Sequence, residues 1–171
     1  LVGAAGAAPF AELAARLAES PARQAIASVL VLGFAVKVGA APVHVWLPLA
    51  HPCAPSAASA VLSGVLVKLG LLGWLRFLPL GETALPSLGD ALVAVGTATA
   101  LYAAAVGVTQ RRPKTVLAYS TVSQMGLAAL VTGFALGDPG RWPAAATASA
   151  VFALHHGLAK ASLFLGAGIT A

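Results

Sequence analysis

Charged residues are scarce in this sequence. Asp, Glu, Lys and Arg make up 9% of its 171 residues, whereas hydrophobic residues make up 59%. Soluble domains carry roughly 25% charged residues. The composition therefore excludes a soluble enzyme and indicates a membrane protein.

Cysteine is almost absent, because the chain holds only Cys53. One cysteine excludes an internal disulfide and a cysteine-based metal cage, and no base pattern beside Cys53 favours a nucleophile. The chain also lacks a glycine-rich phosphate loop and a carboxylate dyad. We expect no cofactor and no metal. The 10 basic residues form no stripe, so a nucleic-acid partner is not expected.

Apolar segments of helical length follow one another along the chain. About 20 residues at ~1.5 Å per residue cross the hydrocarbon core of a bilayer. We predict an all-α polytopic membrane protein of about five transmembrane helices, one of them broken by prolines. The expected spans are 24–40, continued by a half-helix at 43–49, then 56–78, 88–108, 115–136 and 143–169.

The first 23 residues differ from the rest. Residues 1–8 are apolar and are expected to end a preceding transmembrane helix, whereas 9–23 mixes charged and apolar residues as a surface segment does. Residues 24–171 would form the transmembrane domain, incomplete here. Because the chain opens and closes in apolar sequence, we expect it to be part of a longer protein.

The stretch 37–68, KVGAAPVHVWLPLAHPCAPSAASAVLSGVLVK, places a lysine at each end of a proline-rich connection. Proline lacks a backbone N–H and its ring clashes with the preceding turn. We therefore expect Pro42 and Pro48 to break the helix. Broken backbone inside a membrane is tolerated only where protein or water satisfies the freed polar groups.

Three lysines, Lys37, Lys68 and Lys160, lie in three different predicted spans. A lysine at the centre of a membrane helix costs about 2.5–3.5 kcal/mol on insertion scales and usually has a function. The alternative is a structural lysine that snorkels to the interface or pairs with a carboxylate. Snorkelling suits Lys37 beside its break better than Lys68 or Lys160. We favour a proton or ion relay.

Two histidines precede Lys160. His156 shares its helix face because residues four apart are neighbours, and His155 lies about 100° further round. Imidazole titrates near neutral pH and can pass protons, although a satisfied core histidine is an equally good interpretation for His156. A metal site at this pair is improbable because no acidic or thiolate ligand is near. For His44 and His51, capping or loop hydrogen bonding is the better interpretation.

A polar patch begins the span from residue 115. Its members include Ser123 and Gln124, together with Ser120 and Thr121. The hydroxyl groups can bond back to the preceding helical turn, or the patch can hold water between the lysine-bearing helices. The sequence leaves both interpretations open.

The basic loop 110–114, QRRPK, orients the chain. The positive-inside rule places this loop in the cytoplasm. Counting spans then puts the connection 42–55 on the same side, and the segments 10–23, 79–87 and 137–142 on the other. We expect a multi-pass protein of the cell inner membrane.

Three motifs carry a resemblance to a known family. They are the stretch from Lys37 to Arg76 (KVGAAPVHVWLPLAHPCAPSAASAVLSGVLVKLGLLGWLR), RPKTVLAYSTVSQMGL, and LHHGLAKASLFLGAG. In this order they resemble the proton-conducting antiporter-like family. That family includes the large membrane subunits of respiratory complex I, Mrp-type antiporter subunits and membrane subunits of energy-converting hydrogenases. The first motif is similar to component B of hydrogenase-4 and formate hydrogenlyase-type complexes.

The resemblance implies a proton relay at mid-membrane depth. It assigns the lysine of the broken helix to Lys37, the lysine of the next helix to Lys68, and a later histidine and lysine to His156 and Lys160. It also implies a glutamate on an earlier helix as partner of Lys37, and a Lys or Glu on a later one. Where Gln124 stands, complex I relatives often carry histidine.

The function expected from these inferences is proton translocation in a redox-driven complex of NADH:quinone oxidoreductase or energy-converting hydrogenase type. The chain itself would hold no catalytic redox site, and its partners would be other membrane subunits, lipid and protons. Two alternatives stay open. One is Na⁺/H⁺ exchange in an Mrp-like complex, and the other is a structural subunit without conduction.

Overall fold

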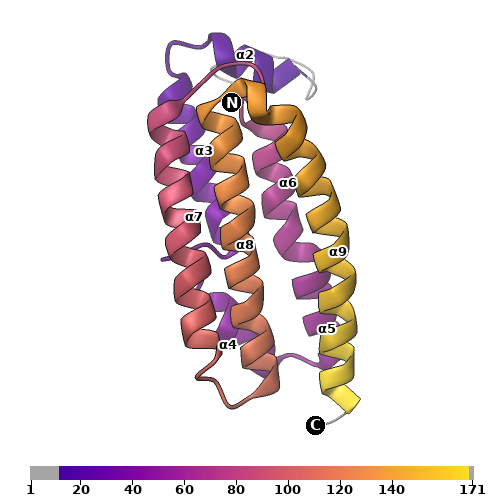
Figure 1. Cartoon of the computed structure of the whole chain (residues 1–171). Helices are drawn as coiled ribbons and strands as arrows, with labels where there is room; N and C mark the ends of the chain where they lie inside the picture. The colour runs from indigo at the N-terminus through magenta and orange to yellow at the C-terminus, as the bar shows by residue number, and fades with distance from the viewer. Residues whose placement is uncertain (1–11, 170–171) are drawn as a thin grey trace.

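The computed structural model describes residues 12–169, which form a bundle of helices without strands (Figure 1). The short helix α2 lies across one end of the bundle, inside the predicted surface segment. The predictions for residues 1–8 and for the start of 9–23 lie outside the described residues. The helices are α2 (Leu13–Glu19), α3 (Arg23–Val38), α4 (Trp46–Cys53), α5 (Ser56–Val61), α6 (Val67–Phe77), α7 (Pro86–Gly107), α8 (Pro113–Gly137) and α9 (Trp142–Ile169).

Four of the predicted membrane spans are confirmed, because four continuous helical stretches are long and apolar enough to cross a bilayer. The broken pair α3 and α4 lies where the fifth span is expected. Two of the stretches begin at a proline, Pro86 and Pro113, two residues before the predicted starts, because proline's missing N–H costs nothing in a first helical turn. The four are Ser56–Phe77, which joins α5 and α6 through the π-turn η2 (Leu62–Leu66), Pro86–Gly107, Pro113–Gly137 and Pro139–Ile169, which includes the 3₁₀ turn η3 (Pro139–Arg141).

Glycine lets α7 and α8 pack backbone against backbone. A Cβ atom added at Gly96 would lie 2.7 Å from the Gly126 carbonyl oxygen, and one added at Gly89 would lie 2.8 Å from that of Gly133. Such distances are shorter than any real Cβ contact. Small residues at helix crossings are the usual means of close packing in membranes, where no hydrophobic force drives helices together.

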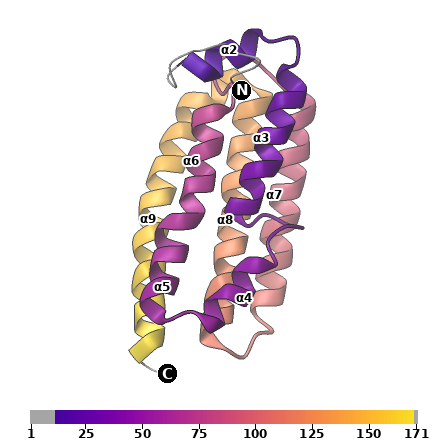
Figure 2. The same cartoon turned by 180° about the vertical axis from the view of Figure 1, so that it is seen from behind.

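The break between α3 and α4 begins at a glycine. Gly39 has φ +77°, a left-handed conformation that ends helices, and Pro42 lies in the turn that follows. The prediction that Pro48 breaks the helix was wrong, because Pro48 lies in the first turn of α4. There its missing N–H would have no helical partner in any case. The break lies about halfway along the bundle (Figure 2).

Side chains satisfy the backbone groups that the break exposes. The Trp46 indole N–H donates to the Val36 carbonyl over 2.8 Å, and the Ala41 N–H donates to the Thr99 hydroxyl oxygen over 3.1 Å. These two groups of the broken backbone thus find their partners within the chain, as backbone in a membrane requires.

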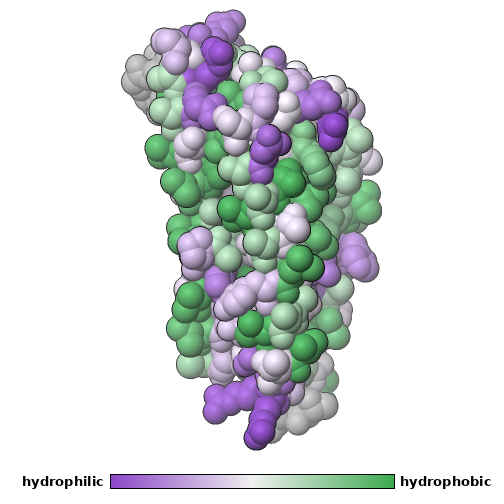
Figure 3. Space-filling view, turned by 60° about the vertical axis from the view of Figure 1, so that its left-hand side comes forward, coloured by the Kyte–Doolittle hydropathy of each residue, from purple (hydrophilic) through white to green (hydrophobic). Residues whose placement is uncertain are grey.

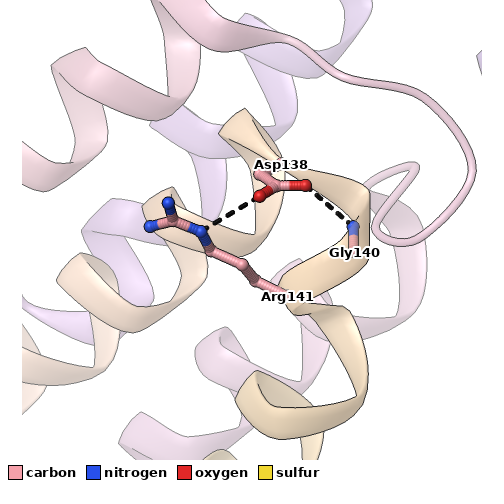
Figure 4. Close-up of polar contacts among 3 residues, drawn as sticks. All are labelled: Asp138, Gly140 and Arg141. Atoms are coloured by element: carbon pink, nitrogen blue, oxygen red, sulfur yellow. Dashed lines mark hydrogen bonds and ion pairs between the residues drawn. The ribbon is translucent and has the colours of Figure 1, made fainter.

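Strongly polar residues gather at the two ends of the bundle, and the surface between them is mostly hydrophobic with a few polar residues at mid-height (Figure 3). At one end, Asp138 closes the turn between α8 and α9 by accepting hydrogen bonds from the Gly140 N–H and the Arg141 guanidinium, over 3.0 and 3.1 Å (Figure 4). At the other end, the Lys114 ammonium donates to the Ala54 carbonyl over 2.9 Å. The loop 110–114 therefore lies at the same end as the junction of α4 and α5.

Candidate functional site

Polar side chains are buried where η2, α8 and α9 meet. Ser63 and Thr121 are fully buried, and His156 and Lys160 are each 4% exposed. Lys68, two residues beyond η2, is half-buried. Because burying polar groups is costly unless they are paired, we followed their hydrogen bonds.

Lys68 and Ser63 begin a chain of contacts. The Lys68 ammonium donates to the Ser63 carbonyl, five residues earlier in the sequence. That carbonyl belongs to η2, and a π-turn departs from the regular α-helical ladder and often marks a functional site. The Ser63 hydroxyl then lies 2.7 Å from the Thr121 hydroxyl of α8.

The chain of contacts continues from Thr121 to Lys160. The Thr121 hydroxyl donates to the Leu117 carbonyl over 3.0 Å, and the Lys160 ammonium donates to the same oxygen over 3.3 Å. Because a hydroxyl has one proton to donate, Ser63 is the donor to Thr121. Lys68 and Lys160 are thus joined through Ser63, Thr121 and Leu117. We call these five residues the polar thread.

His156 lies beside the polar thread. Its ring stacks on Phe152 with centroids 5.3 Å apart, and neither ring nitrogen has a hydrogen-bond partner among the described residues. A buried polar group without a hydrogen-bond partner costs about 1–3 kcal/mol. The fold bears this cost at His156, whose two ring nitrogens are both available for a hydrogen bond or a proton.

No carboxylate pairs with these lysines within residues 12–169. The ion pairs found in that range are Arg16–Glu12 and Arg141–Asp138, both at the same end of the bundle. The ammonium groups of Lys68 and Lys160 are instead held by backbone carbonyls. Either lysine can therefore lose its proton without leaving a buried carboxylate unpaired.

The remaining predicted site residues lie outside the polar thread. Lys37 and His155 are exposed on the surface of the described bundle, and Gln124 is half-buried. The Ser123 hydroxyl donates to the Ala100 carbonyl of α7 over 2.9 Å, so it ties two helices together on the side of α8 that packs against α7.

Two buried residues of this region escaped the sequence interpretation. Ser63 lies five residues before Lys68, a spacing with no distinctive meaning in an α-helix. His51 was assigned to capping or loop bonding, yet it is fully buried and stacks on Phe164 of α9 with centroids 4.3 Å apart. The sequence feature that could have drawn attention to His51 is its residue type, a histidine within an apolar segment.

Comparisons with known proteins agree with this architecture. The whole chain, residues 1–171, matches the family described as NADH:quinone oxidoreductase/Mrp antiporter, TM. An uncharacterized protein of Mycobacterium tuberculosis (strain CDC 1551 / Oshkosh) is 39% identical over 85% of this chain and 24% of its own length. Hydrogenase-4 component B of Escherichia coli (strain K12) is 37% identical over 80% of this chain and 21% of its own length.

A solved structure has the same fold. A chain of the Mrp complex from Dietzia sp. DQ12-45-1b superposes with a TM-score of 0.82 and 29% identity, over 98% of this chain and 30% of that chain. This chain spans about a quarter of the length of the curated relatives it matches. The expected resemblance is confirmed, and the chain belongs to the NADH:quinone oxidoreductase/Mrp antiporter transmembrane family.

Proposed function

We propose that this chain is part of a proton-translocating membrane subunit, and that protons pass between Lys68 and Lys160 along the polar thread. The observation that supports the proposal is the set of contacts, at two backbone carbonyls and one hydroxyl pair, that links the half-buried Lys68 to the buried Lys160 across η2, α8 and α9. A structural lysine would need only one carbonyl partner and no hydroxyl pair between it and a second lysine.

The chemistry follows from the groups present. The carbonyls of Ser63 and Leu117 hold the two ammonium groups in place, and the hydroxyls of Ser63 and Thr121 lie between them. The carbonyls accept hydrogen bonds but take up no proton, whereas a hydroxyl both donates and accepts. In this proposal a lysine ammonium releases its proton to a water molecule beside it, and the hydroxyl pair passes a proton on toward the other lysine. His156, with both ring nitrogens available, offers a second acceptor beside the thread.

The charges couple the two lysines. Lys68 and Lys160 carry the same charge at the two ends of the polar thread, and like charges repel more strongly away from water. Protonation of one lysine therefore favours release from the other. In this proposal Lys37 passes a proton to or from the thread at the helix break, and by the family resemblance its charge is balanced by a glutamate of an earlier helix.

His155, on the outer surface of α9, would serve the relay only through groups beyond the described residues. Of the polar patch residues, Ser123 would support it by fixing α8 beside α7. Neither contribution is needed for the step between Lys68 and Lys160.

The proposed setting is a multi-subunit complex of the cell inner membrane, driven by redox chemistry in other subunits. The similarity to hydrogenase-4 component B supports that setting. The basic loop 110–114 would face the cytoplasm by the positive-inside rule. The fold shared with a chain of an Mrp complex supports an alternative, Na⁺/H⁺ exchange without a redox partner.

The test is proton uptake by vesicles that contain the full-length parent complex, with Lys68→Met and Lys68→Arg compared with wild type. Arginine keeps the positive charge but does not release its proton in proteins. We expect both variants to assemble and to lose most proton uptake. Normal uptake in Lys68→Arg would exclude Lys68 as a proton carrier and favour the structural subunit.

Arg76→Ala is the matched control, because Arg76 is an exposed cation on the same helix and should leave uptake unchanged. Redox turnover and assembly are measured in the same preparation. Uptake that requires Na⁺ and no redox substrate would favour the exchanger.

A further inference from the structure

His51 is a buried histidine that the polar thread does not use. Its side chain is fully buried, and neither ring nitrogen has a hydrogen-bond partner among the described residues. It projects from the last turn of α4 and stacks face to face on Phe164 of α9. Packing therefore fixes the ring while both of its nitrogens stay available.

His51 lies on the way from Lys160 to one end of the bundle. Phe164, its stacking partner, follows Lys160 by four residues and so lies one turn further along the same face of α9. Three residues after His51, the Ala54 carbonyl accepts the hydrogen bond of Lys114. The stacked ring therefore lies between the α9 turn that follows Lys160 and the contact of Lys114 with Ala54.

The contacts of α8 give the same order of residues from Lys160 toward the end of the bundle that bears the loop 110–114. Lys160 contacts the Leu117 carbonyl. Lys114, the last residue of the loop 110–114, lies three residues, or about one turn, before Leu117. Helices α4, α8 and α9 thus place His51 between a buried ammonium group and the polar end of the bundle.

We propose that His51 carries protons between Lys160 and the end of the bundle that bears the loop 110–114. One ring nitrogen takes the proton from the Lys160 ammonium, which leaves a neutral amine and an imidazolium. The other nitrogen then releases its proton to a water molecule that enters from the end of the bundle near Lys114, because the ring itself is enclosed, and transport in the opposite direction reverses both steps. This inference rests on the proposed function, since it extends the path beyond Lys160.

The test uses His51→Phe and His51→Gln in the full-length parent complex. Phenylalanine keeps the aromatic stack on Phe164, and glutamine keeps polar atoms, but neither takes up a proton at neutral pH. We expect both variants to assemble and to lower proton uptake by about tenfold or more, as loss of a proton-transfer group does. His44→Gln is the matched control, because His44 is a second buried histidine of the same connection, packed against Tyr102.

Lys160→Met, measured in parallel, separates the two proposals. If Lys160→Met loses uptake while both His51 variants keep wild-type uptake, His51 is not on the path and the polar thread still stands. If Lys160→Met also keeps wild-type uptake, the proposed function is refuted, and so is the proposed role of His51 as a proton carrier. Assembly of His51→Gln decides the question if the bulkier His51→Phe does not assemble.

Discussion

The hydroxyl groups of Ser63 and Thr121 lie 2.7 Å apart inside the bundle and join η2 to α8. Their dependence on each other is unequal. Thr121 has a second partner in the Leu117 carbonyl, whereas the Thr121 hydroxyl is the partner found for the Ser63 hydroxyl within the described residues. The two residues should therefore respond differently to substitution.

We predict that Thr121→Val destabilises the protein more than Ser63→Ala. Loss of Thr121 leaves a buried serine hydroxyl unpaired, whereas loss of Ser63 leaves threonine with its carbonyl. Interhelical hydrogen bonds in membranes contribute about 0.6 kcal/mol on average and up to about 1.7. Thermal unfolding of the purified complex in detergent measures the order. Equal losses, or the reverse order, would contradict the hydrogen-bond assignment.

The double variant Ser63→Ala/Thr121→Val should be less destabilised than the sum of the two single variants, because it leaves no orphaned hydroxyl. Its proton uptake, however, should be at least as low as that of either single variant. A double variant with wild-type uptake would remove the hydroxyl pair from the proposed path.

A second prediction concerns the helix break. Thr99→Val should destabilise the protein by about 1–3 kcal/mol, since it leaves the Ala41 N–H without its acceptor in the middle of the bundle. Thr99→Ser keeps the hydroxyl and should recover most of the stability. Thr97→Val is the matched control, because the Thr97 hydroxyl bonds only the Val93 carbonyl of its own helix in the described structure. Chemical denaturation of the complex distinguishes them, and similar losses at both positions would refute this account.

A third prediction concerns the contact of α7 with α8. Gly96→Ala should destabilise the protein by about 1–3 kcal/mol, because the added methyl would meet backbone atoms at 2.7 Å and force the helices apart. Gly33→Ala is the control, since nothing lies within 4 Å of a Cβ atom there. Alanine favours a helix over glycine by up to about 1 kcal/mol, so Gly33→Ala should be neutral or stabilising. Thermal unfolding of both variants tests the contrast.

Much of the fold could be predicted because hydropathy reports membrane spans directly. Four spans and the broken helix followed from apolar length and proline density. The position of the break was less accessible. Gly39 ends α3 through its left-handed backbone, and Pro48 fits into a first helical turn. Proline spacing alone does not distinguish a helix breaker from a helix starter.

The candidate site could be predicted only in part. Helical periodicity correctly put His156 and Lys160 on one buried face of α9. The pairing of Ser63 with Thr121 joins residues 58 positions apart, and no local pattern encodes such a contact. Periodicity also could not tell that Lys37 lies on the exposed surface of this bundle while Lys160 lies inside, because that depends on how neighbouring helices are arranged.

The last prediction concerns orientation and uses the exposed thiol of Cys53. Cys53 adjoins Ala54, which Lys114 binds, so the thiol and the basic loop lie at one end of the bundle. If that loop is cytoplasmic, a membrane-impermeant maleimide should label Cys53 in inside-out vesicles and not in right-side-out ones. The parent protein would first be freed of other reactive cysteines.

Gly140→Cys with Cys53→Ala is the control, because the turn closed by Asp138 lies at the opposite end and should label with the reverse pattern. Labelling of both positions from one side would contradict the spanning topology. If Cys53 labelled only in right-side-out vesicles and Gly140→Cys only in inside-out ones, the fold would stand but its orientation in the membrane would be inverted. Protons passing His51 would then enter or leave on the opposite side of the membrane.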